Sequence, residues 1–342
     1  MSKCIFNDGR IVEDFGQPYF VAEVNSSHNG DVEVAKKMID SAAEIGCDCV
    51  KFQSWSVESL YSKTYYKENP IAKRFVKKFA LSPETLKSMS DYARKKGLAF
   101  SSTPYSELEV DFLVEECQVP FIKISSMEMN NAKFLRYIGA KKFPVVLSTG
   151  MSEISEIEFA VKELEKSGAE QMVLLHCVSI YPTEIEILNL NNIFGLREKF
   201  PYPIGFSDHT VGDSAAVAAT ALGAALIEKH LTLDKTKVGM DNAMATEPTE
   251  FKILVDKCKQ IQKAMGSKER ILLPQEYEQR KKMRRSLVAA RDLQVGDILT
   301  EDDLYAKRPG TGLSPDKIDL LIGKKVVREI EKDNLILSED VE

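Results

Sequence analysis

The chain has only four histidines in 342 residues, and each comes at or just after the end of a short apolar run. The four runs are YFVAEV (19–24), QMVLLHC (171–177), PIGFSDH (203–209) and ALIEKHL (225–231), and the histidines are His28, His176, His209 and His230. Such runs predict buried β-strands. Imidazole titrates near neutrality and is the commonest metal ligand in proteins. The pattern therefore predicts one polar site at the strand ends, although any single histidine could instead cap its strand through a backbone hydrogen bond.

Two lysines lie inside apolar runs, where a charged side chain is costly to bury. Lys51 lies in CVKFQ and Lys123 lies in FIKIS. Hydroxyl groups stand at comparable points near the ends of such runs, at Thr103, Ser125, Ser126, Ser148 and Ser207. Two ammonium groups surrounded by hydroxyl donors suit an anion that carries both a carboxylate and a phosphate. The alternative is that the lysines extend to the surface and keep only their alkyl stems buried.

The apolar runs alternate with stretches that carry helix signals. Asn29-Gly30-Asp31 opens the first stretch and Gly46 ends it, while Ser82-Pro83-Glu84 opens a later one that Gly97 ends. The predicted strands are 19–24, 49–55, 98–104, 121–126, 143–150, 171–177, 203–209 and 225–231. Helices are expected at about 106–117, 131–140, 153–167, 190–199, 213–222 and 248–265, and a long polar loop after 55. Eight strands, each followed by a helix, predict an α/β fold of the (β/α)8 TIM-barrel type.

An open doubly wound sheet is the alternative, but no G-x-G-x-x-G follows the first strand. In a barrel, catalytic groups gather at the carboxyl ends of the strands. His209 and His230 end neighbouring strands, so their rings can converge on one divalent metal and leave positions open for water or substrate. Hydrogen bonding of a sugar by the two rings is the competing interpretation. Glu23, Glu128 and Glu228 are candidates for acid–base work, and their spacing does not rank them.

The C-terminal part has a different character. A charged stretch at 267–285 ends in a basic cluster, and from Ser286 onward short β-like pieces are separated by Gly-Asp and Pro-Gly turns. A module of about 57 residues has a small core, so we expect it to pack on its own barrel or on a partner's. Its loop at 307–312 could present Arg308 to an anionic or acetamido-bearing ligand, or could be a solvated turn.

Composition narrows the functional classes. A net charge of −6 and a pI near 5.5 argue against a nucleic-acid-binding surface. No apolar run approaches ~20 residues and the N-terminus lacks an apolar segment, so we expect neither a membrane span nor a signal peptide. Six scattered cysteines suggest neither a disulfide framework nor a zinc site. These features predict a soluble cytoplasmic protein.

Several motifs together resemble one known family. They are AEVNSSHNGDVEVAKKMIDSAAEIGCDCVKFQ, FIKISSMEMNN, LSTGMS, LHCVSIYPT, GFSDHT, IEKHLT and KRPGTG, in this order. The chain resembles the N-acetylneuraminate (sialic acid) synthases and their legionaminate, pseudaminate and spore-coat polysaccharide relatives over residues 17–342. The resemblance implies a barrel at 1–266, a linker at 267–283 and a small β-rich antifreeze-like (SAF) domain at 284–342.

The same resemblance implies a reaction and a set of roles. Phosphoenolpyruvate condenses with the open-chain aldehyde of an N-acyl hexosamine to give a nonulosonic acid and phosphate. The implied phosphoenolpyruvate ligands are Lys51, Thr103, Lys123, Ser126, Ser179 and Ser207, and the implied sugar ligands are Gln53, Tyr181 and Arg308. The implied catalytic residues are Glu23, Glu128, His209 and His230, of which His209 and His230 would bind Mn²⁺ or Mg²⁺. Arg308 would reach the N-acyl group across a domain-swapped homodimer.

Two other functions compete. A related barrel synthase could make a shorter 2-keto sugar acid from a phosphorylated sugar. A non-catalytic carbohydrate- or ice-binding protein would fit the C-terminal module alone, but it would not need Lys51, Lys123, His209 and His230 at strand ends.

Overall fold

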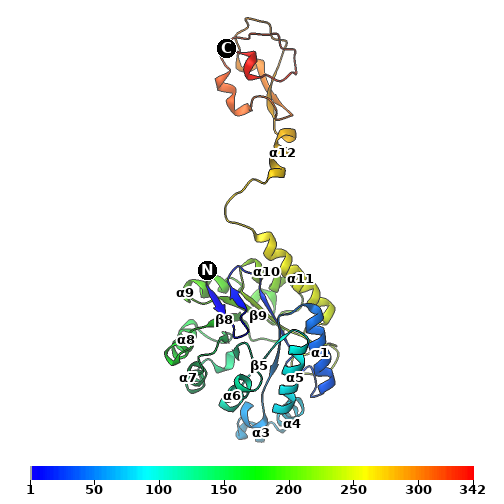
Figure 1. The fold of residues 1–342 in the computed structure, drawn as a ribbon, viewed down its shortest axis with the longest axis vertical. Coiled ribbons are helices and arrows are strands. Elements are labelled where there is room, and N and C mark those ends of the chain that lie inside the picture. The colour runs from blue at the N-terminus through cyan, green and yellow to red at the C-terminus, as the bar shows by residue number, and fades with distance from the viewer. Residues whose placement is uncertain (1) are drawn as a thin grey trace. The chain divides into compact units, whose positions relative to one another are not determined.

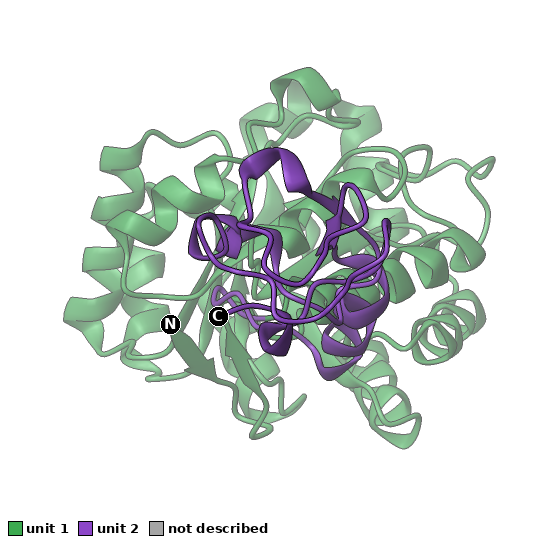
Figure 2. Ribbon diagram, turned by 90° about the horizontal axis from the view of Figure 1, so that it is seen from above, with its two compact units in different colours: residues 1–266 green, residues 267–342 purple. Residues whose placement is uncertain are grey.

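The computed structural model describes residues 2–342. It forms two compact units, residues 1–266 and residues 267–342, which Figure 2 colours separately. Each unit is described by itself below.

The first unit is built on eight parallel strands. They are β3 (Tyr19–Glu23), β4 (Cys49–Gln53), β5 (Ala99–Thr103), β6 (Ile122–Ile124), β7 (Val145–Ser148), β8 (Met172–Cys177), β9 (Ile204–Asp208) and β10 (Leu226–His230). Their order in the sheet is β5-β4-β3-β10-β9-β8-β7-β6, and the two end strands, β5 and β6, contact each other. The sheet is therefore a nearly closed barrel surrounded by helices (Figure 1), and the predicted (β/α)8 fold is confirmed.

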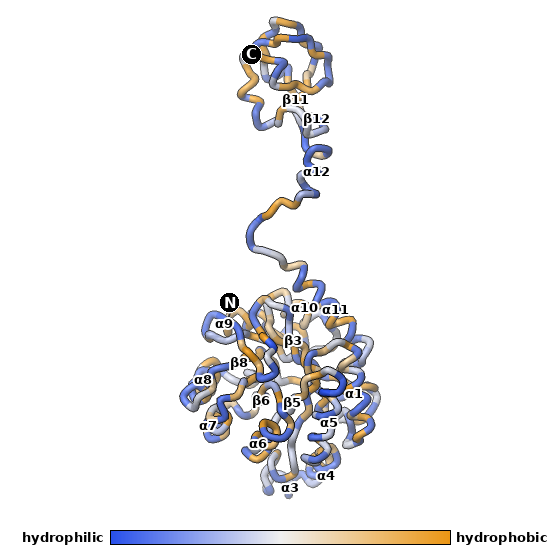
Figure 3. Tube along the Cα trace, viewed as in Figure 1, coloured by the Kyte–Doolittle hydropathy of each residue, from blue (hydrophilic) through white to orange (hydrophobic). Residues whose placement is uncertain are grey.

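The helices after the strands follow the capping signals of the sequence. They are α1 (Val32–Ile45), α5 (Pro83–Lys95), α6 (Glu107–Glu115), α7 (Ala132–Ala140), α8 (Ile154–Ser167), α9 (Asn192–Lys199), α10 (Ser214–Ala221) and α11 (Pro248–Met265). Asp31 caps the backbone of α1 and Gly46 ends that helix with a left-handed φ of 82°. The strands are buried along almost their whole length because helices cover the outside of the barrel, and Figure 3 shows them as largely hydrophobic.

Two parts of this unit were not expected from the sequence. A hairpin of β1 (Lys3–Ile5) and β2 (Ile11–Glu13) packs Cys4, Phe6 and Val12 against the amino ends of the barrel strands. The prediction of a long polar loop after residue 55 is wrong, because this segment contains three helices. They are α2 (Val57–Leu60), α3 (Lys63–Glu68) and α4 (Pro70–Phe79). These helices have their own small core of Trp55, Tyr66, Val76 and Phe79.

The second unit contains α12 (Pro274–Met283), then the antiparallel pair β11 (Ser286–Ala289) and β12 (Leu304–Lys307), and several short 3-10 turns. Helix α12 occupies most of the stretch that was expected to be a linker. The second unit has a separate core that includes Leu287, Leu293, Leu299, Val326 and Ile336. This small β-rich unit is the second half of the predicted fold class.

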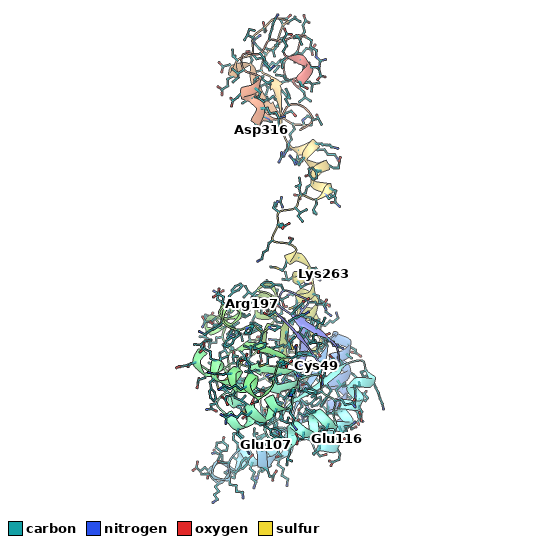
Figure 4. All side chains as sticks on the ribbon, turned by 60° about the vertical axis from the view of Figure 1, so that its left-hand side comes forward. Cys49, Glu107, Glu116, Arg197, Lys263 and Asp316 are labelled. Atoms are coloured by element: carbon teal, nitrogen blue, oxygen red, sulfur yellow. The ribbon has the colours of Figure 1, made fainter. Side chains whose placement is uncertain are left out.

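The six cysteines are all buried and free, with Cys49 inside the barrel unit (Figure 4). Among residues 2–342, no helix has the length and apolar character needed to cross a membrane.

Candidate active site

A cavity of about 200 Å³ opens at the carboxyl ends of the barrel strands. Its lining includes most of the predicted site residues, namely Glu23, Lys51, Gln53, Thr103, Lys123, Ser126, Ser179, Tyr181, Ser207, His209 and His230. A larger groove of about 560 Å³ lies beside α3 and α4, but its lining is mostly aromatic and aliphatic, with Glu68 as its single ionised group. The smaller cavity is the candidate site because charged groups from many strands converge in it.

The two lysines form one side of the cavity, which we call the lysine side. Lys51 and Lys123 are each only 3% exposed, so the alternative in which they extend to the surface is wrong. The Lys51 ammonium donates to Thr103 Oγ1 at 3.1 Å and contacts the Glu23 carboxylate. The Lys123 ammonium donates to Ser148 Oγ at 2.6 Å. Burial lowers the pKa of Lys51 to about 7, against the opposing attraction of Glu228.

Glu228 connects the two lysines. Its carboxylate oxygens lie 3.7 Å from the Lys51 ammonium and 3.7 Å from the Lys123 ammonium, and Ser207 Oγ donates to it at 3.1 Å. Burial raises the pKa of Glu228, but the two ammonium groups and the Ser207 hydroxyl outweigh burial and leave that pKa below its usual value. The protein's own carboxylates thus pair with both lysines.

A second group of small donors lies next to the lysine side. Gly150 donates its backbone N–H to Ser126 Oγ at 2.9 Å, and Ser126 Oγ lies 3.3 Å from Cys177 Sγ. A Cβ at Gly150 would overlap Ser179 Oγ and Cys177 Sγ, at 2.3 Å and 2.7 Å. Glycine is therefore required there for the backbone to approach these side chains, and Ser126 and Ser179 can face the same ligand.

His209 and His230 form the opposite side, the imidazole side. Their ring centroids lie 5.6 Å apart, and the Tyr181 ring lies 4.3 Å from that of His209. His209 Nδ1 must donate its hydrogen to the Val178 carbonyl at 2.8 Å, so Nε2 keeps a free lone pair when the ring is neutral. His230 Nδ1 is buried and has no hydrogen-bond partner among the described residues. Burial lowers the pKa of both rings and so favours the neutral form that a metal requires.

The other two histidines do not join this site, so the prediction of a single polar site containing all four is wrong. His28 Nδ1 accepts from the Gly30 backbone N–H at 3.0 Å, and His176 Nε2 bonds the Leu188 carbonyl at 2.8 Å. Both behave as backbone-bonded structural histidines. On β8 it is Cys177 that lines the cavity. Because neighbouring side chains on a strand point to opposite faces, His176 points away from it.

Further polar contacts extend from Glu23 along the cavity wall. Gln53 Nε2 lies 3.4 Å from Glu23 Oε1, and Gln53 Oε1 accepts from the Tyr105 hydroxyl at 2.8 Å. Since an ionised Glu23 can only accept, the Gln53 amide is held with its NH₂ toward Glu23 and its oxygen toward Tyr105. Asp241 also lines the cavity and contacts the Asn25 amide, and burial raises its pKa to about 6.

Sequence reasoning did not identify Tyr105, Met127, Met151, Cys177 and Asp241 as cavity residues. Most of them follow strand ends at positions without apolar periodicity. Two predicted residues are outside the lining. Glu128, in η1 (Ser126–Glu128), accepts from the Asn131 amide at 2.7 Å, and burial raises its pKa. Arg308 is exposed in the second unit.

The described residues offer two imidazoles to a metal and not a complete protein cage. Over residues 2–342, no cluster of three or more His, Cys, Asp and Glu side chains is arranged to hold an ion. Two free imidazole nitrogens at a polar cavity nevertheless fit a divalent metal whose other ligands come from water or substrate.

A nearly closed (β/α)8 barrel whose cavity gathers two buried lysines and two imidazoles at the strand ends has the layout of an enzyme active site. Residues 38–270 match the NeuB family and residues 284–342 match the SAF domain. The chain is 38% identical over 327 residues to N,N'-diacetyllegionaminic acid synthase of Campylobacter jejuni, covering 92% of this chain and 98% of that one. It is 35% identical over 344 residues to N-acetylneuraminate-9-phosphate synthase of Homo sapiens, covering 98% and 95%.

A solved structure gives the same assignment. The N-acetylneuraminic acid synthetase of Leptospira borgpetersenii superposes with a TM-score of 0.75 at 32% identity, covering 82% of this chain and 95% of that one. The chain therefore belongs to the NeuB family and carries a SAF domain. The family resemblance and the nonulosonic acid synthase class predicted from the sequence are confirmed, and with them the enzyme class that forms a carbon–carbon bond.

Proposed function

We propose that this enzyme condenses phosphoenolpyruvate with the open-chain aldehyde of an N-acyl hexosamine, such as N-acetylmannosamine or a 2,4-diacetamido-trideoxyhexose. C3 of phosphoenolpyruvate bonds to the aldehyde carbon, the aldehyde oxygen takes up a proton, water adds at C2, and phosphate leaves to give the 2-keto acid. The observation that carries the proposal is the cavity of about 200 Å³, which Lys51, Lys123, His209 and His230 line together.

In the proposed complex the lysine side binds phosphoenolpyruvate. Its carboxylate and phosphate replace part of the contact that Glu23 and Glu228 make with Lys51 and Lys123. Thr103, Ser126, Ser179 and Ser207 add neutral donors around the same anion. This arrangement fixes the orientation of the enol and excludes bulk water from it, because the two ammonium groups are almost fully buried.

His209 and His230 would hold Mn²⁺ or Mg²⁺, which when bound polarises the aldehyde as a Lewis acid. The Val178 carbonyl fixes the His209 tautomer, so the free nitrogen of that ring faces away from the backbone. Glu23 contacts both Lys51 and the Gln53 amide, which suits a carboxylate that positions water or substrate between the two sides.

The sugar would lie near Gln53 and Tyr181, which both line the cavity, Tyr181 beside the His209 ring. Glu128 is proposed to transfer a proton at the sugar, because η1 also carries the cavity residues Ser126 and Met127 and a raised pKa suits a general acid. Arg308 is proposed to bind the N-acyl group from a partner chain in a domain-swapped homodimer. The small core of the second unit supports this, since so little buried apolar surface favours packing on another surface.

The test is a product screen with purified full-length protein, phosphoenolpyruvate and Mn²⁺. The panel contains N-acetylmannosamine, its 6-phosphate, 2,4-diacetamido-trideoxyhexoses and arabinose 5-phosphate, read by phosphate release and product mass. A nine-carbon 2-keto acid is expected, and Lys123→Met serves as the inactive control. Turnover with arabinose 5-phosphate alone would replace the proposal with the shorter-acid synthase, and no turnover with any sugar would contradict both.

The proposed dimer has its own test. A chain truncated at about residue 283 and a full-length His230→Ala chain should each be inactive, and mixing them should restore some turnover if one barrel receives the other chain's second unit. A monodisperse monomer with full activity in analytical ultracentrifugation would contradict the dimer.

A further inference from the structure

A buried ion pair lies behind the imidazole side, and the proposed mechanism does not use it. The Lys229 ammonium donates to Asp208 Oδ2 at 2.7 Å, and both residues are 1% exposed. The pairing of β10 with β9 places Lys229 directly opposite Asp208. Because Ser207, His209, Glu228 and His230 line the cavity, the residues between them point to the other face of the sheet.

The pair is part of a closed ring of bonds around His209. Lys229 also donates to the Thr210 carbonyl at 2.8 Å. Asp208 Oδ1 accepts from the Thr210 backbone N–H at 2.9 Å and from Thr210 Oγ1 at 2.8 Å. His209 therefore lies between two residues that are both tied to Lys229, and Lys229 immediately precedes His230.

Stability alone does not explain such a pair. Taking two charges out of water costs several kcal/mol, and replacing a buried pair with apolar residues of similar volume is often neutral or stabilising. What this ring does provide is a fixed spacing between the backbone positions that carry the two imidazoles. Groups that orient metal ligands from behind typically affect metal affinity about 10- to 100-fold.

We infer that Asp208, Lys229 and Thr210 form a brace that sets the spacing of His209 and His230, so that these three are positioning residues for the divalent metal. The inference rests on the proposed metal-binding role of the two histidines. It extends that role to residues that touch neither the cavity nor the substrate.

The test measures Mn²⁺ binding by the electron paramagnetic resonance of free and bound ion, without turnover, on full-length protein. In the double variant Asp208→Leu/Lys229→Met, we expect an unchanged or higher Tm and a Mn²⁺ Kd raised about 10- to 100-fold. Thr210→Val, which removes one hydroxyl donor and keeps the shape, should raise the Kd about threefold even if the double variant does not fold.

A matched control is the pair of Arg197 and Asp14, whose Nε and Oδ1 lie 3.2 Å apart at the opposite end of the barrel. The variant Arg197→Met/Asp14→Leu should leave the Mn²⁺ Kd of the folded protein unchanged. An unchanged Mn²⁺ Kd in both brace variants would overturn the brace while leaving the metal site intact. If instead the unaltered protein and His209→Ala bind Mn²⁺ equally, the proposed metal role fails, and the brace loses its function with it.

Discussion

The lysine side and the imidazole side of the cavity differ in how the protein partners their nitrogen atoms. Lys51 and Lys123 have internal carboxylate and hydroxyl partners. On the imidazole side, His209 Nδ1 donates to the Val178 carbonyl, but His230 Nδ1 is buried without a hydrogen-bond partner among residues 2–342. The ammonium groups are therefore held by the protein itself, whereas one imidazole nitrogen has a position that a metal or a substrate group would satisfy.

This difference predicts different failures when each side is altered. Substitution on the lysine side leaves a buried carboxylate without its counter-charge, so part of the loss comes from the protein's own charges. Substitution of His209 removes the donor to the Val178 carbonyl, whereas His230 Nδ1 has no hydrogen-bond partner among residues 2–342. Substitution of a lysine should affect both stability and anion binding, and substitution of His230 should affect mainly metal binding.

The largest expected effect is on the imidazole side. Removal of metal by EDTA, or His209→Ala or His230→Ala, should abolish measurable turnover, because the polarising group is lost. Tm measured without metal should fall less for His230→Ala than for His209→Ala, because His209 Nδ1 donates to the Val178 carbonyl and His230 Nδ1 has no hydrogen-bond partner among residues 2–342. Mn²⁺ titration and calorimetry check the two halves of this expectation, and full activity in metal-stripped protein would contradict it.

On the lysine side, Lys51→Ala and Lys123→Ala should each weaken phosphoenolpyruvate binding by roughly 2–4 kcal/mol. Each should also lower Tm, because Glu228 is left with one ammonium partner. Isothermal titration with phosphoenolpyruvate gives the affinity, and the KM for the sugar serves as the internal control because it should move much less. An unaltered phosphoenolpyruvate affinity in both variants would show that the lysines serve the fold alone.

Much of this site could be predicted because strand ends are marked by simple patterns. Lys51, Lys123, His209 and His230 all stand in or at the end of apolar runs, and the barrel brings those ends together. Residues such as Tyr105 and Asp241 come from loops after the strands, where no periodicity indicates which side chain turns inward. The prediction that Glu128 lines the cavity failed for the same reason, because the conformation of η1 decides where the Glu128 side chain points.

The histidines show a second limit. His176 and His209 end neighbouring strands, yet only His209 faces the cavity. A shift of one residue along a strand moves the side chain to the other face of the sheet. Because the apolar runs are buried on both faces, the sequence shows no polar–apolar alternation that would tell which residues point into the barrel. The short helices at 57–79 were missed for a different reason, since segments of four to ten residues interrupted at Asn69-Pro70 are shorter than the stretch over which helical periodicity can be recognised.

A histidine used by the fold should respond to pH in a way that contrasts with the imidazole side. Burial lowers the pKa of His28 from 6.5 to about 4. The unfolded chain therefore binds the proton more readily than the folded protein, and the stability this group contributes is present above pH 6.5 and is lost as pH falls toward 4. At pH 4.5 the loss amounts to roughly 2–3 kcal/mol.

His28→Asn keeps an acceptor for the Gly30 N–H and cannot titrate in this range. Denaturant unfolding at pH 7 and pH 4.5 should therefore show a smaller loss for the variant than for the unaltered protein, by roughly 2–3 kcal/mol. Equal losses would mean that other groups control acid stability.

The smallest expected effect concerns the hydrogen bond that Tyr105 donates to Gln53. Tyr105→Phe removes the hydroxyl that donates to Gln53 Oε1 and keeps the ring against Trp55, whose centroid lies 6.2 Å away. Without that donor the Gln53 amide is held by its contact with Glu23 alone, so its orientation toward the sugar is less well fixed. A hydrogen bond of this kind contributes about 1 kcal/mol, which corresponds to a roughly fivefold rise in the sugar KM. The KM for phosphoenolpyruvate should stay the same, because Lys51 and Lys123 keep all their partners. Steady-state kinetics with each substrate varied in turn makes the distinction, and equal rises in both KM values would mean that Tyr105 supports the whole cavity and not the orientation of Gln53.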